Sequence, residues 1–237
     1  MPAPIIGRMP LLLVRHGETA LNVARVLQPA ATPLSARGLA QADAVARRFT
    51  GARVVQIISS DLPRALATAQ AIAAATGAPV LTTPLLHERN FGDWRGRSYD
   101  GMALDPRTWH DAPPGGESAD AFYARVALAW AHVVAVAGAL SETLRQARSP
   151  ASSRAEAVSD APREAEPAVV VVTHGLVLGA MLSRHVRLAE GSVVPAHLRN
   201  TGVSIVEAHP PHAARLVDCT QHLDDRTHDD AGALSGG

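Results

Sequence analysis

The chain has a single cysteine, Cys219, among its 237 residues, and its 22 basic and 22 acidic residues leave no net charge. One cysteine excludes an intramolecular disulfide framework and is typical of a reducing compartment, so we expect a cytoplasmic protein. The balanced charge gives no indication of a surface for nucleic acid. The sequence also lacks zinc-finger spacing, a Walker loop, a dinucleotide-binding glycine pattern and internal repeats. We therefore expect neither a metal nor a cofactor.

Patterns for secretion or membrane insertion are missing as well. Arg8 is followed by a very short apolar run that ends at Arg15, which is unlike a signal peptide. Residues 121–140 are nearly all apolar, but Arg125 and His132 interrupt them, and alanine is only weakly hydrophobic. This stretch predicts a buried helix rather than a membrane span, and we expect no contact with a membrane.

Strand-like and helix-like segments alternate along the chain. Predicted strands lie at about 10–15, 53–59, 79–82, 168–173, 202–208 and 214–218, and predicted helices at 35–49, 62–76, 118–145 and 175–186. This alternation favours a three-layer α/β/α sandwich, a mostly parallel twisted sheet with helices on both faces.

The length fits a single domain over residues 1–237. A stretch rich in Ser, Ala, Pro and Glu at about 147–167 predicts a flexible surface insertion, and residues 224–237 predict a loose tail.

Two aliphatic runs end in a histidine and a glycine that permits a sharp turn. Residues 11–14 lead into Arg15-His16-Gly17, and residues 169–172 lead into Thr173-His174-Gly175. Open α/β sheets bind ligands at the carboxyl ends of their strands, and neighbouring strands lie about 4.8 Å apart. We expect the two imidazoles to lie side by side. Arginine matches phosphate oxygens and a neutral imidazole can be a nucleophile, so the pattern indicates phosphate chemistry.

Two more segments supply candidate groups for this chemistry. Residues 54–65 predict a strand, a loop and a helix start, with Ser60 or Asp61 as the N-cap. Arg64 then lies in the first helical turn, where an anion meets both a guanidinium and free backbone amides. The polar loop at 87–96 offers Glu88 and Asp93 for proton transfer, although either carboxylate alone is more often a surface charge.

Five motifs in one order resemble the histidine phosphatase superfamily, also called the phosphoglycerate mutase-like family. They are Arg15-His16-Gly17-Glu18, Ser59-Ser60-Asp61-Leu62-x-Arg64-Ala65, Glu88-Arg89-x-Phe91-Gly92-x-Trp94-x-Gly96, Pro-Gly-Gly-Glu-Ser at 114–118, and Thr173-His174-Gly175. The resemblance runs from about residue 10 to about residue 217. It implies one antiparallel strand in the sheet, a small-molecule phosphate ester as the partner and a possible homodimer.

The resemblance also implies a role for each matching residue. His16 matches the nucleophile that becomes a phosphohistidine, and Glu88 matches the acid that protonates the leaving oxygen and then activates water. Arg15, Arg64 and His174 match the phosphate clamp, and Asn22 matches a further phosphate ligand. We expect a neutral His16 whose other ring nitrogen is held by an acceptor and, with the substrate bound, a protonated His174 and a protonated Glu88.

The acceptor of the phosphoryl group distinguishes two activities. Cofactor-dependent phosphoglycerate mutases carry the motif Glu-Arg-His-Tyr-Gly, and the corresponding segment here is Glu-Arg-Asn-Phe-Gly at 88–92. The tyrosine of the motif is replaced by Phe91, so its hydroxyl is missing. We therefore expect a metal-independent phosphomonoesterase, with phosphoglycerate mutase as the alternative. A non-catalytic binding module or a protein phosphohistidine phosphatase fits less well. For the specificity pocket we expect residues 27–33, 91–99 and 109–117.

Overall fold

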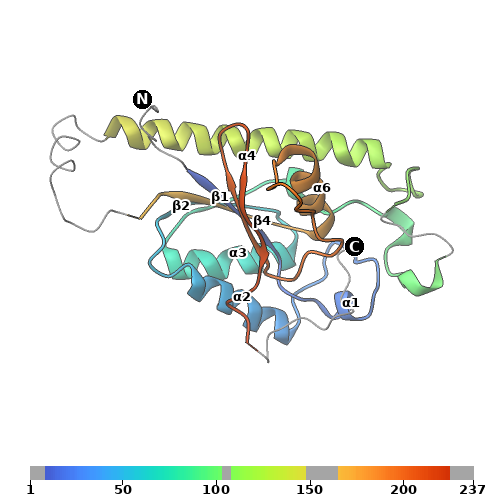
Figure 1. The fold of residues 1–237 in the computed structure, drawn as a ribbon. Coiled ribbons are helices and arrows are strands. Elements are labelled where there is room, and N and C mark those ends of the chain that lie inside the picture. The colour runs from blue at the N-terminus through green and yellow to red at the C-terminus, as the bar shows by residue number, and fades with distance from the viewer. Residues whose placement is uncertain (1–8, 103–107, 148–164, 225–237) are drawn as a thin grey trace.

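A computed structural model describes residues 9–102, 108–147 and 165–224, which form a six-stranded sheet between two layers of helices (Figure 1). The strands run in the order β3 (Val80–Thr82), β2 (Val54–Ser59), β4 (Ala168–Thr173), β1 (Pro10–Arg15), β5 (Val203–Glu207) and β6 (Ala214–Cys219). Only β5 runs antiparallel to its neighbours within this described sheet. The three-layer prediction and the single antiparallel strand are both confirmed.

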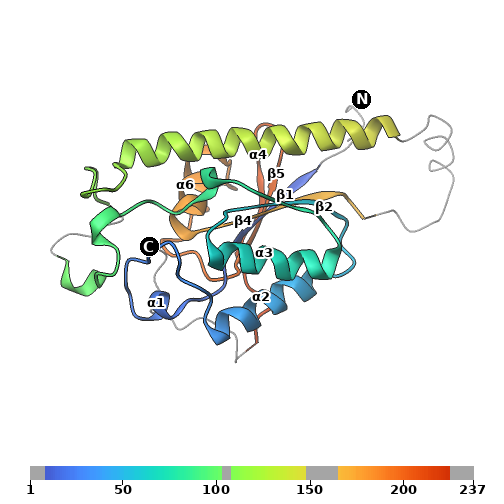
Figure 2. The same cartoon turned by 180° about the vertical axis from the view of Figure 1, so that it is seen from behind.

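Helices cover both faces of the sheet, as the reverse view shows (Figure 2). One face carries α4 (Ala119–Ala147) and α6 (Gly175–His185), and the other carries α2 (Ala36–Arg48) and α3 (Pro63–Thr76). Each predicted strand and helix lies within two residues of its observed bounds. The short helix α1 (Ala20–Val23) and three 3-10 turns, η1 (Pro84–Leu86), η2 (Gly92–Trp94) and η3 (Tyr99–Gly101), were not predicted.

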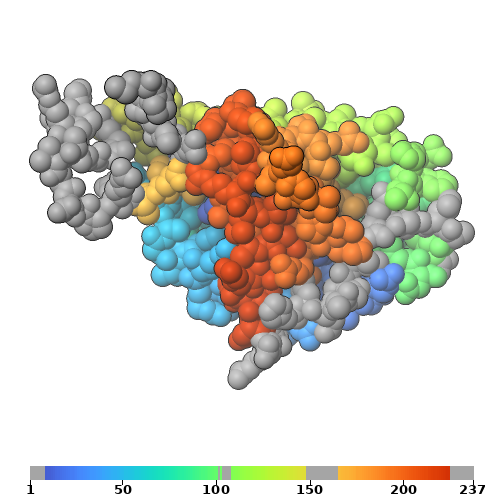
Figure 3. Space-filling view, viewed as in Figure 1, coloured from blue at the N-terminus to red at the C-terminus, as the bar shows by residue number. Residues whose placement is uncertain are grey.

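The central strands are buried on both sides, which explains their unbroken aliphatic runs. Leu11 and Leu13 of β1 face the core beneath α4 and α6, while Leu12 and Val14 face the core beneath α2 and α3. In the space-filling view, β5 and β6 lie on the same face of the molecule as the segment that follows α6 (Figure 3).

Helix α4 contains the apolar stretch that the sequence assigns to a buried helix. By length and composition alone it would be long enough to cross a membrane. One of its faces packs in the core with α6 and the sheet, through Phe122, Val126, Ala129, Trp130, Val133 and Ala137. This packing confirms a core helix on that face, while Leu128 on the opposite side is exposed.

The predicted insertion at 147–167 and the tail at 224–237 lie almost entirely outside the described residues. Ala147 ends α4, and the described chain resumes at residue 165. Glu166 then pairs with Arg215 of β6 at 3.1 Å. The insertion, the tail and the single-domain division remain predictions.

Candidate active site

The two imidazoles lie side by side at the carboxyl ends of β1 and β4. The parallel register places Arg15 opposite Thr173, so the residues that follow, His16 and His174, emerge together. Their ring centroids are 5.0 Å apart. The backbone N–H of His16 donates to the carbonyl of Thr173 at 2.9 Å, which extends the strand pairing to the histidine. The predicted pairing of the two histidines is confirmed.

His16 is held in one tautomer. Its Nδ1 lies 2.6 Å from the carbonyl oxygen of Gly17. Because a carbonyl only accepts, Nδ1 carries the hydrogen and Nε2 keeps its lone pair. Burial, Arg64 and Arg15 hold the pKa of His16 well below its usual range. The side chain is therefore a neutral imidazole with a free Nε2, as expected for a nucleophile.

Gly17 is needed for close packing and not for an unusual backbone angle. Its φ is not positive, so the expected sharp turn is not the reason for a glycine here. A Cβ on Gly17 would collide with the carbonyl of Gly38 in α2. The N–H of Gly17 donates to Oγ1 of Thr68 at 3.1 Å, and the hydroxyl of Thr68 donates to the carbonyl of Arg64 at 2.9 Å. These contacts fix the peptide that orients His16.

Two arginines are buried beside the histidines. Arg15 and Arg64 are each 1% exposed. Nη1 of Arg15 donates to the carbonyl of Leu198 at 2.6 Å, and Nη1 of Arg64 lies 3.4 Å from the carbonyl of Ala30. Burial lowers the pKa of Arg64 to about 10, so the guanidinium stays charged at neutral pH. The pair provides a fixed positive site for an anion.

Arg64 lies in the first turn of α3, as predicted, but the predicted caps are wrong. The N-cap is Leu62, and no side chain caps the helix. The hydroxyl of Ser60 instead lies 2.9 Å from Nε2 of His174, and it accepts from the N–H of Leu62 at 3.2 Å. Asp61 is half exposed and pairs with His87 at 2.5 Å.

His174 is neutral in the unliganded site. Burial, Arg64 and His16 hold its pKa well below the usual range. The expected protonated His174 concerns the ring with a phosphoryl group bound, so the lowered pKa of the free protein leaves it a prediction. The hydroxyl of Ser60 can donate to Nε2, and in that arrangement the hydrogen of the neutral ring lies on Nδ1. Nδ1 is buried and has no hydrogen-bond partner among the described residues, so it is available to a ligand.

Asn22 has a similar spare donor. It is 1% exposed, and its Oδ1 accepts from the N–H of Thr19 at 3.0 Å in a capping box at α1. Its Nδ2 is buried and finds no acceptor in the described part of the chain. A buried amide donor that lacks a partner loses its hydration without compensation, unless a ligand supplies the acceptor.

Glu88 is the buried carboxyl group of the site. Its Oε1 accepts from the N–H of Arg89, and its Oε2 accepts from the N–H of Leu176, both at 3.0 Å. Burial raises the pKa of Glu88, although the two amides and the nearby arginines partly offset this effect. The direction agrees with the expected acid. Asp93, the other candidate, is exposed.

A charged pair that the sequence did not indicate holds the Glu88 loop. The carboxylate of Glu117 accepts from Nη2 of Arg125 at 2.7 Å and from the N–H of Asn90 at 2.9 Å. Nη1 of Arg125 also donates to the carbonyls of Leu85 and His87. The sequence placed Glu117 in a motif and in the expected specificity segment 109–117, but did not indicate its pairing with Arg125. The pair fastens the loop to α4.

The sequence and the fold both match known proteins. Residues 11–140 match the family description of the histidine phosphatase superfamily, branch 1. A Yersinia pestis (strain Pestoides F) protein named probable phosphoglycerate mutase GpmB is 31% identical over 196 residues, which cover 82% of this chain and 83% of that protein.

Two mycobacterial structures resemble the fold. The glucosyl-3-phosphoglycerate phosphatase has a TM-score of 0.63 and 25% identity over 90% of this chain and 99% of its own. A protein called mycobacterial hydrolase 1 has a TM-score of 0.63 and 26% identity with the same coverage, 90% and 99%. The relatives thus include proteins named as a mutase and as a phosphatase.

Proposed function

Because the chain belongs to the histidine phosphatase superfamily, we propose that it hydrolyses small phosphate monoesters through a phosphohistidine on His16, without a metal ion. One observation carries the proposal. A neutral His16 with a free Nε2 lies beside two buried arginines, Arg15 and Arg64, and the same two arginines also act on Glu88, a carboxyl group whose pKa burial raises. We assign these groups the roles of nucleophile, anion site and acid.

The reaction has two steps. Nε2 of His16 attacks phosphorus in line as the bond to the ester oxygen breaks, and the carboxyl group of Glu88 gives its proton to the leaving alkoxide. Water then attacks the phosphorus of the phosphohistidine, and the carboxylate of Glu88 takes a proton from that water. The phosphorus–nitrogen bond breaks, and inorganic phosphate leaves with His16 and Glu88 restored.

Four side chains are suited to hold the transferring group. The guanidinium groups of Arg15 and Arg64, the Nδ1–H of His174 and the Nδ2–H of Asn22 can donate to its non-bridging oxygens. A bound phosphate dianion raises the pKa of both His174 and Glu88. Its negative charge favours the imidazolium form of His174 and disfavours the carboxylate form of Glu88. Substrate binding therefore promotes the protonated forms of His174, which holds the phosphoryl group, and of Glu88, which acts as the acid.

Phe91 favours water over a second substrate as the acceptor. Its ring is 1% exposed and packs with Leu27 and Tyr99, so this position offers no hydroxyl to a retained phosphoglycerate. The phosphatase among the structural relatives agrees with hydrolysis. The name of the Yersinia relative supports the alternative, a phosphoglycerate mutase. A cytoplasmic location, the absence of membrane contact and a homodimer remain predictions from the sequence.

A phosphate-release screen in the presence of a chelator tests the proposal. The panel comprises p-nitrophenyl phosphate, 3-phosphoglycerate and sugar phosphates, with mutase activity measured in parallel in the presence of 2,3-bisphosphoglycerate. We expect phosphate release that persists with the chelator and disappears in His16→Ala. Isomerisation of 3-phosphoglycerate with little release would establish the mutase instead, and inhibition that added metal reverses would contradict metal independence.

A further inference from the structure

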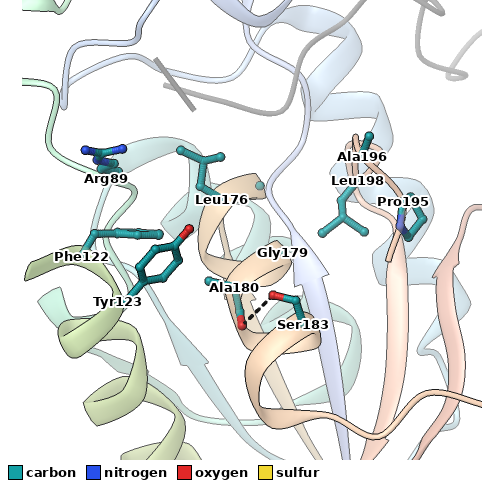
Figure 4. Close-up of a pocket in the computed structure, with 11 residues that line it drawn as sticks. Arg89, Phe122, Tyr123, Leu176, Gly179, Ala180, Ser183, Pro195, Ala196 and Leu198 are labelled. Carbon is teal, nitrogen blue, oxygen red and sulfur yellow. Dashed lines mark hydrogen bonds between the residues drawn. The ribbon is translucent and has the colours of Figure 1, made fainter. Parts of the chain in front are cut away.

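A pocket of about 170 Å³ lies over α6, between the start of α4 and residues 195–198 (Figure 4). Its lining combines small, aliphatic and aromatic residues with one arginine, from four parts of the chain. They are Arg89, Phe122, Tyr123, Gly175, Leu176, Gly179, Ala180, Ser183, Pro195, Ala196 and Leu198. None of these residues lies in the loops at 27–33, 91–99 and 109–117 that the sequence suggested for specificity.

The pocket shares its walls with the phosphate site. Leu176 and Arg89 line it, and their backbone N–H groups hold the two oxygens of Glu88. Leu198 lines the other side, and its carbonyl holds Arg15. The group that leaves phosphorus departs next to Glu88, because Glu88 protonates its oxygen. The pocket therefore adjoins the place where the alcohol part of the ester begins.

The lining is poor in groups that could bind hydroxyls. Of the described lining residues, only Arg89, Tyr123 and Ser183 have polar side chains. The hydroxyl of Ser183 donates to the carbonyl of Ala180 at 3.3 Å, and the guanidinium of Arg89 donates to the carbonyls of Glu117 and Asp111. The hydroxyl of Tyr123 then remains as the lining side-chain group that can bind a substrate hydroxyl. A sugar placed here would exchange several hydrogen bonds with water for few replacements, which is unfavourable.

On the basis of the proposed phosphatase activity, we propose that this pocket receives the alcohol part of the ester, and that this part is a compact apolar group of about one six-membered ring. The size agrees with the volume, because an engineered apolar cavity of about 150 Å³ in another protein holds benzene. The ring contacts Leu176, Leu198 and the aromatic edge formed by Phe122 and Tyr123. Polyhydroxylated esters gain nothing from these contacts.

Two primary alkyl phosphates compare the two kinds of alcohol. 2-Phenylethyl phosphate carries a ring on a short chain, and glycerol 3-phosphate carries hydroxyls, while both leave as alkoxides. Burial of one phenyl ring predicts a kcat/KM that is on the order of 10- to 100-fold higher for the phenyl ester. Equal values, or a preference for glycerol 3-phosphate, would overturn the inference.

Gly179→Leu fills the pocket without moving the backbone. Gly179 lines the pocket, and a Cβ built on it meets no atom within 4 Å. We expect the ratio of kcat/KM for the phenyl ester to that for glycerol 3-phosphate to fall about tenfold or more. Gly138→Leu is the matched control, because Gly138 is an exposed glycine inside α4 with equally open space around its Cβ position. It should leave both kcat/KM values as in the wild type.

A binding measurement separates this inference from the proposed function. 3-Phenylpropylphosphonate has a carbon in place of the ester oxygen, so it cannot be hydrolysed, and calorimetry measures its affinity without turnover. We expect Gly179→Leu to weaken its binding at least tenfold relative to Gly138→Leu. Unchanged affinity would overturn the pocket assignment even in an active phosphatase. Tight, pocket-dependent binding without hydrolysis of any ester would support the pocket and reject the phosphatase.

Discussion

Glu88→Gln removes the acid while keeping the size of the side chain. If Glu88 protonates the leaving oxygen, turnover of alkyl phosphates should fall by about 10²–10⁴-fold. p-Nitrophenolate leaves with little need of a proton, so kcat for p-nitrophenyl phosphate should fall by less than about tenfold. The structure also predicts a stability cost. The carboxylate accepts from the N–H groups of both Arg89 and Leu176, and an amide can offer its oxygen to only one of them.

The unpaired donor should cost about 1–3 kcal/mol, or roughly 2–12 °C in Tm for a chain of this length. Activity is therefore measured well below the Tm of the variant, with pre-steady-state kinetics for each ester. Asp93→Asn is the matched control, because Asp93 is an exposed carboxylate in the same loop. It should behave as the wild type on both esters. Equal losses on both esters in Glu88→Gln would refute the acid role of Glu88.

Four further predictions concern the nucleophile, its partners and the anion site. His16→Ala should abolish turnover and labelling by the phosphoryl group of the substrate, and labelled protein in this variant would disprove the covalent step. Ser60→Ala removes the hydroxyl that lies 2.9 Å from Nε2 of His174. It should lower kcat about tenfold and shift the pH profile, whereas a purely structural role would change Tm alone. Because the pKa of His16 lies well below its usual range, activity on p-nitrophenyl phosphate should persist below pH 6.5. Activity on alkyl phosphates needs the protonated form of Glu88, so it should decline as the pH rises through the raised pKa of Glu88. Inorganic phosphate at 100 times its Kd should raise the free energy of unfolding by about 2.7 kcal/mol, which calorimetry detects as a higher Tm. An unchanged Tm would show that Arg15 and Arg64 do not form an anion site.

The sequence was sufficient to predict the parts of the fold and the site that depend on local pattern. The aliphatic runs before His16 and His174 predict buried strands, and two parallel strands place their carboxyl ends at one edge of the sheet. The pairing of Leu11 with Val169 and of Val14 with Val172 then brings the two histidines together. Arg64 follows from the same logic, because a proline fixes the start of α3 just before it.

The groups that hold the side chains could not be predicted in this way. The Glu88 carboxyl is held by the N–H of Leu176, which is 88 residues away, and Arg15 is held by the carbonyl of Leu198, which is 183 residues away. Every residue has a backbone N–H or carbonyl, so side-chain identity does not indicate which one will be used. Ser60 was interpreted as a helix cap because serine commonly caps helices, and only the packing of β2 against β4 brings it to His174.

Burial prepares the nucleophile and the acid by the same physical effect. Removing water disfavours the charged form of any group, so it lowers the pKa of His16 and raises the pKa of Glu88. The arginines act unequally on the two, since they reinforce the shift of the histidine and oppose that of the carboxyl group. Glu88 therefore depends on burial to keep its proton. Asp93 lies in the same loop but is exposed, so Glu88 is the carboxyl group of this loop that the fold removes from water.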